Sequence, residues 1–385
     1  MLHTTGANGA PAGAKSCVIE GVPLLCRPQR RHSDFPSLDL ARASRMTAPQ
    51  TNYMVTAADP SSWMTIKSGL VLANESKSQL TIKFSQPPRT MFLVRKISSD
   101  EARNALIELA EWLMKEHGVA IVVEEADADD MFMRFDRFNG HIDLCVCLGG
   151  DGTLLHLSSL FQEQHCPPVI AFAMGTLGFL TPLNLSDVRL HLSRILQPSP
   201  ESLYITLRMR LLCEIYRHGS NIPEARHLVL NECLIDRGAN SCLSVLELII
   251  DDVLVTVVQA DGLIVATPTG STAYSLSAGG CMVAPSVPAI LITPVCPHTL
   301  SFRPAVISDS SQVRIRVPVG RCPGAAASFD GSHCTHLNHG DEVRLLMSPM
   351  AIPTINEHAF STDWFHSIVQ KLHWNVRSPT PTCSL

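Results

Sequence analysis

The sequence predicts an open α/β domain followed by an antiparallel β-sandwich domain, with a C-terminal helix that packs back on the α/β domain. Two patterns favour this α/β plus all-β class. Apolar runs alternate with amphipathic helical segments in residues 86–202, and short β-rich segments separated by turn residues follow in residues 203–350. With 385 residues, 45% hydrophobic and 17% charged, the chain is long and apolar enough for about two to three folded domains.

The α/β prediction begins with a strand, a helix and a second strand. Residues 92–96 form a short apolar run, and Ser98-Ser99-Asp100-Glu101 is typical of a capping box at the start of a helix. Apolar residues then recur at helical spacing until Gly118, namely Leu106, Leu109, Ala110, Leu113 and Met114. Residues 119–123 supply the next strand. Such a unit spans about 30 residues, and its continuous apolar strands indicate a parallel sheet covered on both faces.

The rest of this half continues the alternation of strands and helices. Apolar runs predict strands over residues 142–148 and 169–173. Helical spacing predicts helices over residues 153–161 and 187–196, the second of them capped by Ser186. Open α/β sheets of this kind bind their ligands at the carboxyl ends of the strands.

The second half changes to a strand pattern. Alternating or β-branched segments with short turns between them predict strands over residues 203–216, 228–236, 243–250, 253–259 and 313–317, which is typical of an antiparallel sandwich. Near the end, residues 362–374 predict a helix whose apolar face holds Trp364, Phe365, Ile368 and Leu372. Because such a face needs an apolar partner, we expect residues 351–377 to return to the α/β domain.

The two ends of the chain carry weaker patterns. Residues 1–85 are rich in Gly, Pro, Ser and Thr and show no sustained period, so we expect a mostly disordered tail with short extended pieces at residues 65–72 and 80–84. Residues 378–385 are predicted as a second tail. Up to residue 50 the first tail contains arginines and few acidic residues, a bias shared with organelle transit peptides.

Charge and cysteine content narrow the partners and the compartment. The net charge of −5 offers no electrostatic footprint for nucleic acid or an anionic membrane, and no run of about 18 apolar residues predicts a membrane span. The 13 cysteines are scattered through apolar runs, as is typical of buried thiols in a reducing compartment. We therefore expect a cytoplasmic protein without nucleic-acid or membrane partners, with a mitochondrial or plastid location through the tail as the alternative.

One glycine-rich turn stands where a buried strand meets a helix. In Gly149-Gly150-Asp151-Gly152-Thr153 the glycines let the backbone approach a phosphate, and the helix N-terminus presents free N–H groups to it. An aspartate in such a turn repels phosphate unless it works through a metal or accepts a proton, so Asp151 is a candidate Mg²⁺ partner or general base. On these five residues alone, a tight turn with Asp151 capping the helix stays open as the alternative.

A second constellation follows a short strand that begins at Asp261-Gly262. The hydroxyl-rich turn Thr267-Pro268-Thr269-Gly270-Ser271-Thr272 precedes a predicted helix and offers neutral donors to a phosphate, and Tyr274 offers a ring for stacking. Asn231-Glu232 interrupts a β-rich run, where the two side chains either point to solvent or meet ribose hydroxyls and a base edge. Taken alone, that pair favours the solvated interpretation.

Several motifs in register resemble the NAD kinase family from about residue 91 to 377. The matching segments are residues 149–153, Leu177-Gly178-Phe179-Leu180, Asn231-Glu232, Asp261-Gly262, residues 268–274 and Phe329-Asp330-Gly331. The chain is most similar to the animal-type enzymes through residues 292–298 and Leu372-His373-Trp374-Asn375. This resemblance implies an α/β nucleotide domain plus a β-sandwich domain, with both contributing to the cleft.

The resemblance also implies a reaction and a site. The family transfers the γ-phosphate of ATP, with a divalent metal expected to be Mg²⁺, to the 2′-hydroxyl on the adenosine ribose of NAD, giving NADP. Asp151 matches the family's catalytic aspartate. The positions that match its binding residues for NAD and for phosphate are Gly149, Gly150, Gly152, Thr153, Asn231, Glu232, Asp261, Gly270, Ser271, Thr272, Ala273, Tyr274, Ser275 and Ser277. A homo-oligomer, dimer or tetramer, is expected, and no metal ligand is identified.

Two other functions remain as alternatives at this point. A catalytically inactive NAD(P)-binding sensor would keep the binding residues without turnover. A lipid kinase of the diacylglycerol or sphingosine type shares Gly-Gly-Asp-Gly-Thr, but its second motif, a Gly-Thr-Gly-Asn-Asp-like loop, is replaced here by Gly175-Thr176-Leu177-Gly178-Phe179. The lipid substrate is therefore disfavoured.

Overall fold

The computed structural model describes residues 80–128, 131–198, 202–320, 324–358 and 360–375, together with three short strands before them. Strands β1 (Val18–Ile19) and β2 (Val22–Pro23) pair with each other, and β3 (Tyr53–Ala57) pairs with β4 (Leu80–Phe84). The extended piece expected at residues 65–72 and the tail expected at residues 378–385 lie outside the described residues. Most of the disorder predicted for residues 1–85 also falls outside them.

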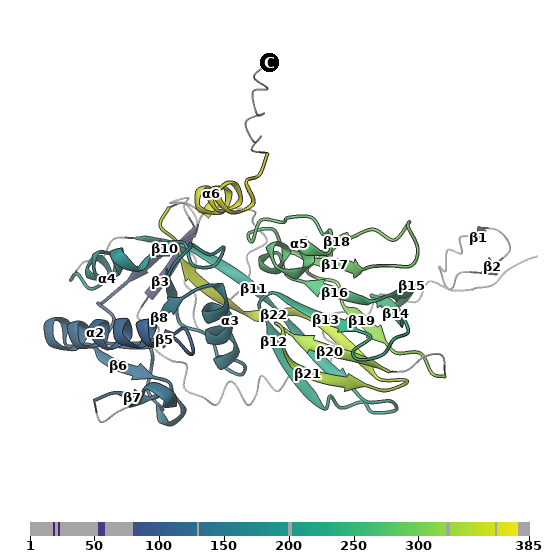
Figure 1. Cartoon of the computed structure of the whole chain (residues 1–385), viewed down its shortest axis with the longest axis horizontal. Helices are drawn as coiled ribbons and strands as arrows, with labels where there is room; N and C mark the ends of the chain where they lie inside the picture. Colours follow the sequence, from purple (N-terminus) through teal and green to yellow (C-terminus); the bar gives the residue numbers. More distant parts are fainter. Residues whose placement is uncertain are drawn as a thin grey trace, which may run out of the picture. The chain divides into compact units, whose positions relative to one another are not determined.

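The first half is an α/β region built on parallel strands (Figure 1). Its strands are β5 (Thr90–Arg95), β6 (Ala120–Val123), β7 (Met133–Arg134), β8 (Leu144–Gly149), β9 (Val169–Ala173) and β10 (Leu183–Asn184). The sheet order is β9-β8-β5-β6-β7, with β10 beside β9. The helices are α2 (Asp100–His117), α3 (Asp151–Leu160) and α4 (Val188–Ile195). The open α/β prediction is confirmed.

The helix caps agree with the sequence only in part: Ser99 caps α2, but Ala102 and not Glu101 is the third helical residue, so the predicted capping box does not form. At the start of α2, the Ser99 Oγ accepts a hydrogen bond from the Ala102 N–H at 3.2 Å, and Gly118 ends the helix in the left-handed conformation. The predicted cap of α4 by Ser186 is wrong. A 3₁₀ turn (Leu185–Asp187) precedes that helix and encloses Ser186, so Asp187 takes the N-cap position, without a side-chain capping bond.

The second half is an antiparallel β-sandwich whose main core lies between its two sheets. Its strands are β11 (Leu203–Tyr216), β12 (Ala225–Val229), β13 (Glu232–Asp236), β14 (Ser244–Ile250), β15 (Val253–Ala260), β16 (Gly262–Ala266), β17 (Ala289–Val295), β18 (Ala305–Ser308), β19 (Val313–Arg316), β20 (Ala325–Phe329), β21 (Ser332–Leu337) and β22 (Glu342–Ile355). The smaller sheet has the order β18-β17-β16-β13-β20-β21. Side chains from both sheets, such as Leu211 and Leu263, form one buried cluster between them.

The predicted strand over residues 228–236 is in fact two strands. Leu230 and Asn231 lie between β12 and β13, and their backbone N–H groups donate to the Asp330 carboxylate at 2.7 and 2.8 Å instead of to a neighbouring strand. The Asp330 carboxylate thus takes the place of a neighbouring strand at these two residues, which separates β12 from β13.

The two halves share one continuous sheet. β22 pairs antiparallel with β11 over the length of both strands. At its end, β22 also pairs in parallel with β9 of the α/β region, where Thr354 lies opposite Val169. The large sheet therefore runs β15-β14-β19-β22-β9-β8-β5-β6-β7. The domain boundary predicted at residue 350 falls inside β22 and does not separate two independent sheets.

The α/β region begins before the predicted boundary at residue 86. In β4, Ile82 and Phe84 are fully buried in the α/β core, and Leu80–Phe84 pairs with the first residues of β11. The extended piece expected at residues 80–84 is confirmed, but its assignment to the tail is wrong. Two large apolar side chains bind this segment to the folded body, which local sequence pattern does not reveal.

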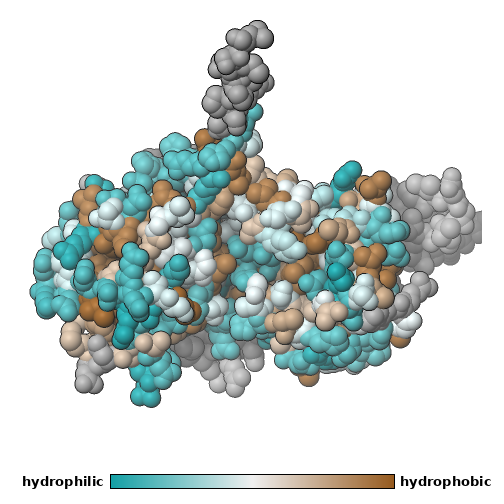
Figure 2. Space-filling model, viewed as in Figure 1, coloured by the Kyte–Doolittle hydropathy of each residue, from teal (hydrophilic) through white to brown (hydrophobic). Residues whose placement is uncertain are grey.

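The C-terminal helix α6 (Phe360–Leu372) covers the residues predicted for it almost completely. Ile368 is buried in it, whereas Phe365 and Leu372 are 48% and 38% exposed. The expected apolar face is therefore only partly covered. On the face of the molecule drawn in Figure 2, hydrophobic residues are dispersed among hydrophilic ones. Within the described part of the chain, no helix is long and apolar enough to cross a membrane.

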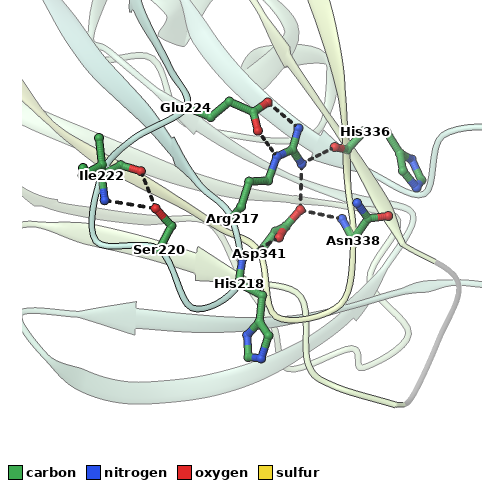
Figure 3. Close-up of polar contacts among 8 residues, drawn as sticks. All are labelled: Arg217, His218, Ser220, Ile222, Glu224, His336, Asn338 and Asp341. Carbon is green, nitrogen blue, oxygen red and sulfur yellow. Dashed lines mark hydrogen bonds and ion pairs between the residues drawn. The ribbon is translucent and has the colours of Figure 1, made fainter.

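A polar network fixes the turns at one end of the sandwich (Figure 3). The Arg217 guanidinium donates to both carboxylate oxygens of Glu224 at 2.6 and 2.7 Å and to Asp341 at 2.7 Å. Asp341, which is buried, also accepts from the backbone N–H groups of His218 and Asn338, both at 2.9 Å. The network ties the turn after β11 to the turn before β22, so the two longest strands are held together at this end.

Candidate active site

The glycine turn joins the end of β8 to the start of α3. Gly149 ends the strand, Gly150 is the N-cap of the helix, and Asp151 is its first residue. A Cβ atom at Gly149 would overlap the Thr153 hydroxyl, which accepts a hydrogen bond from the Gly150 N–H at 3.3 Å. The absence of a side chain at Gly149 is therefore required for this close approach.

The Asp151 carboxylate is held by a second turn, which follows β9. It accepts hydrogen bonds from the backbone N–H groups of Phe179 and Leu180, both at 2.9 Å, and from the Thr181 hydroxyl at 3.3 Å. A Cβ atom at Gly178 would overlap the carboxylate, so this turn also needs a glycine. A carboxylate can accept about four hydrogen bonds, and these donors leave room for about one more.

A buried arginine lies behind this second turn. The Arg208 guanidinium donates to Thr354 Oγ1 at 3.1 Å and to the Phe179 carbonyl at 3.4 Å. Burial lowers the pKa of Arg208 to about 10, and the negative charge of Asp151 opposes that shift. Because this pKa remains above neutral pH, Arg208 keeps a positive charge beside the turn that holds Asp151.

The glycine turn opens into a cavity of about 530 Å³ with basic side chains on its wall. These are Arg95, Lys96, His156 and Lys371, and Asp151 is the acidic side chain among the described lining residues. Arg95 is paired with Asp127 at 2.6 Å. The His156 Nε2 atom donates a hydrogen bond to the Glu124 carboxylate at 2.8 Å, which raises the pKa of His156. Cationic groups around a helix N-terminus make this cavity suited to a polyphosphate.

Asn231 and Glu232 form a second group, organised by Asp330. The Asp330 carboxylate, on a residue with φ +48°, accepts from the N–H groups of Leu230, Asn231 and Glu232 at 2.7, 2.8 and 3.1 Å. Burial, followed by the nearby charge of Asp330, raises the pKa of Glu232 to about 8. The Glu232 Oε2 atom is buried without a hydrogen-bond partner among the described residues. Such an oxygen is suited to accept from a ligand hydroxyl.

The hydroxyl-rich turn lies directly against Asn231. The Thr267 N–H donates to the Asn231 carbonyl at 2.9 Å, and a Cβ atom at Gly270 would overlap the Asn231 backbone. The chain then forms a 3₁₀ turn (Thr269–Thr272) and the short helix α5 (Tyr274–Ser277). The structure thus brings the two predicted segments together.

The hydroxyls of this segment do not all face the same way. Ser271 Oγ donates to the Val283 carbonyl at 3.0 Å, and Ser275 Oγ lies 2.8 Å from Thr293 Oγ1. Both serines are fully buried, so these contacts fix the turn, while Tyr274 is 42% exposed and Ser277 is exposed. The exposed residues are the ones that remain available to a ligand.

Asp261 lies away from this group. It pairs with Arg237 at 2.9 Å, next to Gly262, which pairs with Asp236 at the far end of β16 from Ala266. The strand has five residues and therefore spans about 17 Å. Within one chain, the structure does not bring Asp261 to Asn231 or to the turn at Thr267.

The second group is anchored to the end of α3 opposite Asp151. The Arg210 guanidinium donates to the carbonyls of Ser158 and Phe161 at 3.2 and 2.8 Å, and Gln162 exchanges two hydrogen bonds with the backbone of Leu228 at 3.2 and 2.7 Å. Helix α3 therefore carries Asp151 at its start, and its end fixes β12, the strand that leads into Asn231.

Comparison with known proteins agrees with this arrangement. The family model described as the ATP-NAD kinase N-terminal domain matches residues 90–199, and the ATP-NAD kinase C-terminal domain matches residues 230–357. The chain belongs to the NAD kinase family. The match decides against the lipid-kinase alternative and confirms the resemblance seen in the sequence.

Relatives of this NAD kinase family chain include plant and yeast proteins. It is 41% identical over 327 residues to "NAD kinase 2, chloroplastic" of Arabidopsis thaliana, covering 81% of this chain and 33% of that protein. It is 46% identical over 256 residues to an "ATP-NADH kinase" of Saccharomyces cerevisiae, covering 63% of this chain and 50% of that protein. The chain thus spans about a third to a half of the length of these relatives.

Solved NAD kinase structures show the same fold. The crystal structure of yeast NADH kinase complexed with NADH matches with a TM-score of 0.72 and 31% identity, over 81% of this chain and 94% of that one. An NAD kinase from Archaeoglobus fulgidus in complex with ATP matches with a TM-score of 0.54 and 22% identity, over 71% of this chain and 96% of that one. This second likeness supports the fold alone.

Three residues at this candidate site carry no functional prediction from the sequence. Asp330 was noted within a motif, but its three backbone contacts were not expected. An Asp-Gly pair between two strands was the signal for a tight hairpin turn there. Arg208 and Lys371 had no local signal, since each reaches the Asp151 turn from a distant part of the chain.

Proposed function

We propose that the chain transfers the γ-phosphoryl group of ATP to the 2′-hydroxyl on the adenosine ribose of NAD, giving NADP. Membership of the NAD kinase family and the names of the plant and yeast relatives support this activity. The observation that carries it is the placement of Asp151. One carboxylate, fixed by three donors, faces a cavity whose other charged lining groups are cationic.

In this proposal Asp151 accepts the proton of the attacking ribose hydroxyl. The three hydrogen bonds orient the carboxylate and leave about one acceptor position for that hydroxyl. The N–H groups at the start of α3 and the cationic lining groups bind the phosphates and stabilise the charge that develops during transfer. Catalysis then depends mainly on positioning and electrostatics.

The donor set at the cavity fits a Mg²⁺ ion that arrives with the nucleotide. Mg²⁺ in kinases is held by one or two carboxylates plus substrate phosphates and water, and Asp151 supplies one carboxylate beside the phosphate cavity. No group of three or more His, Cys, Asp or Glu side chains within the described ranges could hold a metal by itself. Mg²⁺ held there by phosphate oxygens and water beside Asp151 would neutralise the triphosphate, and the free acceptor position of Asp151 would stay with the ribose hydroxyl.

The NAD site is proposed around Asn231 and Glu232. The unpartnered Oε2 of Glu232 would accept from a ribose hydroxyl, and Tyr274 would stack on a ring. The remaining predicted contacts stay part of the proposal: Gly149, Gly150, Gly152 and Thr153 for phosphate, and Gly270, Thr272, Ala273 and Ser277 for the dinucleotide. Ser271 and Ser275 would act by shaping the turn, and Asp261 lies too far along β16 to join them within one chain. A homo-oligomer and a cytoplasmic location, with an organelle as the alternative, also remain predictions.

A coupled assay tests the proposed function. The full chain is incubated with ATP, Mg²⁺ and NAD or NADH, and the product is read with an NADP-specific dehydrogenase after oxidation of any NADPH. We expect NADP formation that stops when either ATP or Mg²⁺ is omitted. Binding of NAD by isothermal titration without turnover would instead favour the inactive sensor.

A further inference from the structure

The C-terminal helix α6 delivers a lysine to the phosphate cavity. Lys371, in the last turn of α6, lines the same cavity as Gly150 and Asp151. Its ammonium donates to the Leu177 carbonyl and lies 5.1 Å from the centre of the Phe179 ring. The contact joins residues that are 194 positions apart in the chain. A helix at the end of the chain thus reaches the turn that holds Asp151.

The surroundings of Lys371 leave its charge without an acidic partner. Within the described residues no carboxylate forms an ion pair with it, although its side chain is half-buried. Burial lowers the pKa of Lys371, and the negative charge of Asp151 opposes this shift. A carbonyl and an aromatic ring are weak partners for an ammonium in such a place, whereas a phosphate would match its charge.

The other lysines of the described part are exposed, whereas Lys371 is half-buried. Lys115, for example, is largely exposed on α2 and pairs with Glu111 at 2.7 Å within the same helix. Lys96 is exposed at the rim of the cavity. The Lys371 side chain is instead held at the cavity by helix α6 and by its contacts with the Leu177 carbonyl and the Phe179 ring. The side chain therefore loses less conformational freedom when it binds a ligand.

We propose that Lys371 binds the phosphates of the phosphoryl donor, so that α6 forms part of the donor site. The inference rests on the proposed function, because it assumes that a triphosphate enters this cavity. On donor binding the ammonium exchanges the Leu177 carbonyl for phosphate oxygen. The turn at residues 177–181 is then held by its contacts to Asp151 and Arg208.

The first test uses inorganic triphosphate as the probe and the full chain as the protein. Its affinity is measured by isothermal titration for the wild type, Lys371→Gln and Lys371→Arg, with Lys115→Gln as the matched control on another helix. A charge-assisted contact predicts about tenfold or more weaker binding for Lys371→Gln. Lys371→Arg should stay within about threefold of the wild type, since it keeps the charge.

The second test separates a donor contact from a merely structural role. In the NAD kinase assay, Lys371→Gln should raise KM for ATP about tenfold and leave KM for NAD unchanged, because only the donor meets the ammonium. Melting temperatures of all variants are measured in parallel. Equal changes in both KM values, or unchanged triphosphate affinity in Lys371→Gln, would overturn the proposal.

The two tests also separate this inference from the proposed function. If the wild type makes no NADP but binds triphosphate in a Lys371-dependent way, the NAD kinase activity is wrong and the phosphate-binding role stands. If the wild type makes NADP and Lys371→Gln binds triphosphate and ATP normally, the activity stands and the role of Lys371 is wrong.

Discussion

Two carboxylates of the candidate site, Asp151 and Glu232, lie in opposite environments. Asp151 borders an open cavity, and the fold supplies it with three hydrogen-bond donors. Glu232 is buried, its pKa is raised to about 8, and one of its oxygens has no partner among the described residues. The fold therefore fixes Asp151 before any ligand arrives, whereas Glu232 is completed by a ligand.

The largest effect is expected at the fixed carboxylate. Asp151→Asn should lower kcat by about a hundredfold or more, because an amide can neither accept the ribose proton nor carry charge beside Mg²⁺. Steady-state kinetics measure the loss, and circular dichroism checks that the fold is kept. A loss of only a few fold would contradict the assignment of Asp151 as the base and leave it as a capping residue.

A smaller effect, on binding, is expected at the buried carboxylate. Glu232→Gln should raise KM for NAD about tenfold with little change in KM for ATP, since an amide cannot lose a proton on ligand binding and accept from ribose hydroxyls as a carboxylate does. The two KM values are measured in the same preparation. If both rise together, Glu232 does not act on the dinucleotide.

The raised pKa of Glu232 also predicts how stability depends on pH. The folded-state pKa of about 8 lies above the ordinary value of about 4.3. Between pH of about 4.3 and about 8, Glu232 therefore keeps its proton in the folded chain and has lost it in the unfolded chain. The contribution of Glu232 to stability is therefore fully present below pH of about 4 and is lost as pH rises to about 8. Glu232→Gln should gain stability relative to the wild type over this window, measured by urea unfolding at several pH values without ligand. A difference that stays constant with pH would show that Glu232 is ionised in the folded chain.

The smallest effect is expected from one donor of the Asp151 carboxylate. Thr181→Val removes the hydroxyl that lies 3.3 Å from Asp151 and that accepts from the Gly178 N–H at 3.0 Å, and it leaves the two backbone N–H donors to Asp151 in the sequence. At 3.3 Å this hydrogen bond to a carboxylate is long and contributes about 1 kcal/mol, so kcat should fall about fivefold. Thr181→Ser, which retains the hydroxyl, should stay near the wild type. A loss as large as that of Asp151→Asn would mean that the hydroxyl itself takes part in the reaction.

Local pattern predicts local structure well in this chain. β9 (Val169–Ala173) and β11 (Leu203–Tyr216) begin and end where the apolar runs predict, because turn or polar residues bound both segments. The glycine turn places Asp151 at the start of a helix for the same reason, since strand, glycines and helical spacing are all contiguous. The roles of the site residues stay predictions until the variants are measured.

Contacts between distant segments could not be predicted from such patterns. β4 joins the sheet by pairing with residues 203–205, and burial of Ile82 and Phe84 depends on a core that forms elsewhere. The contact of Lys371 with Leu177 likewise depends on how α6 returns to the site. Neither hydrophobic period nor composition encodes a partner that is more than a hundred residues away, so these features emerge only in the folded chain.

The shared sheet has a mechanical consequence for how substrates enter. β11 and β22 are each 14 residues long, and their pairing extends from the sandwich to the α/β region. A hinge motion between the two halves would break or bend the pairing of β11 with β22. Such a motion costs backbone hydrogen bonds along the middle of the molecule. Substrate access is therefore expected to involve motion of α6, which lies outside these paired strands, while the sheet and the turn that holds Asp151 stay fixed.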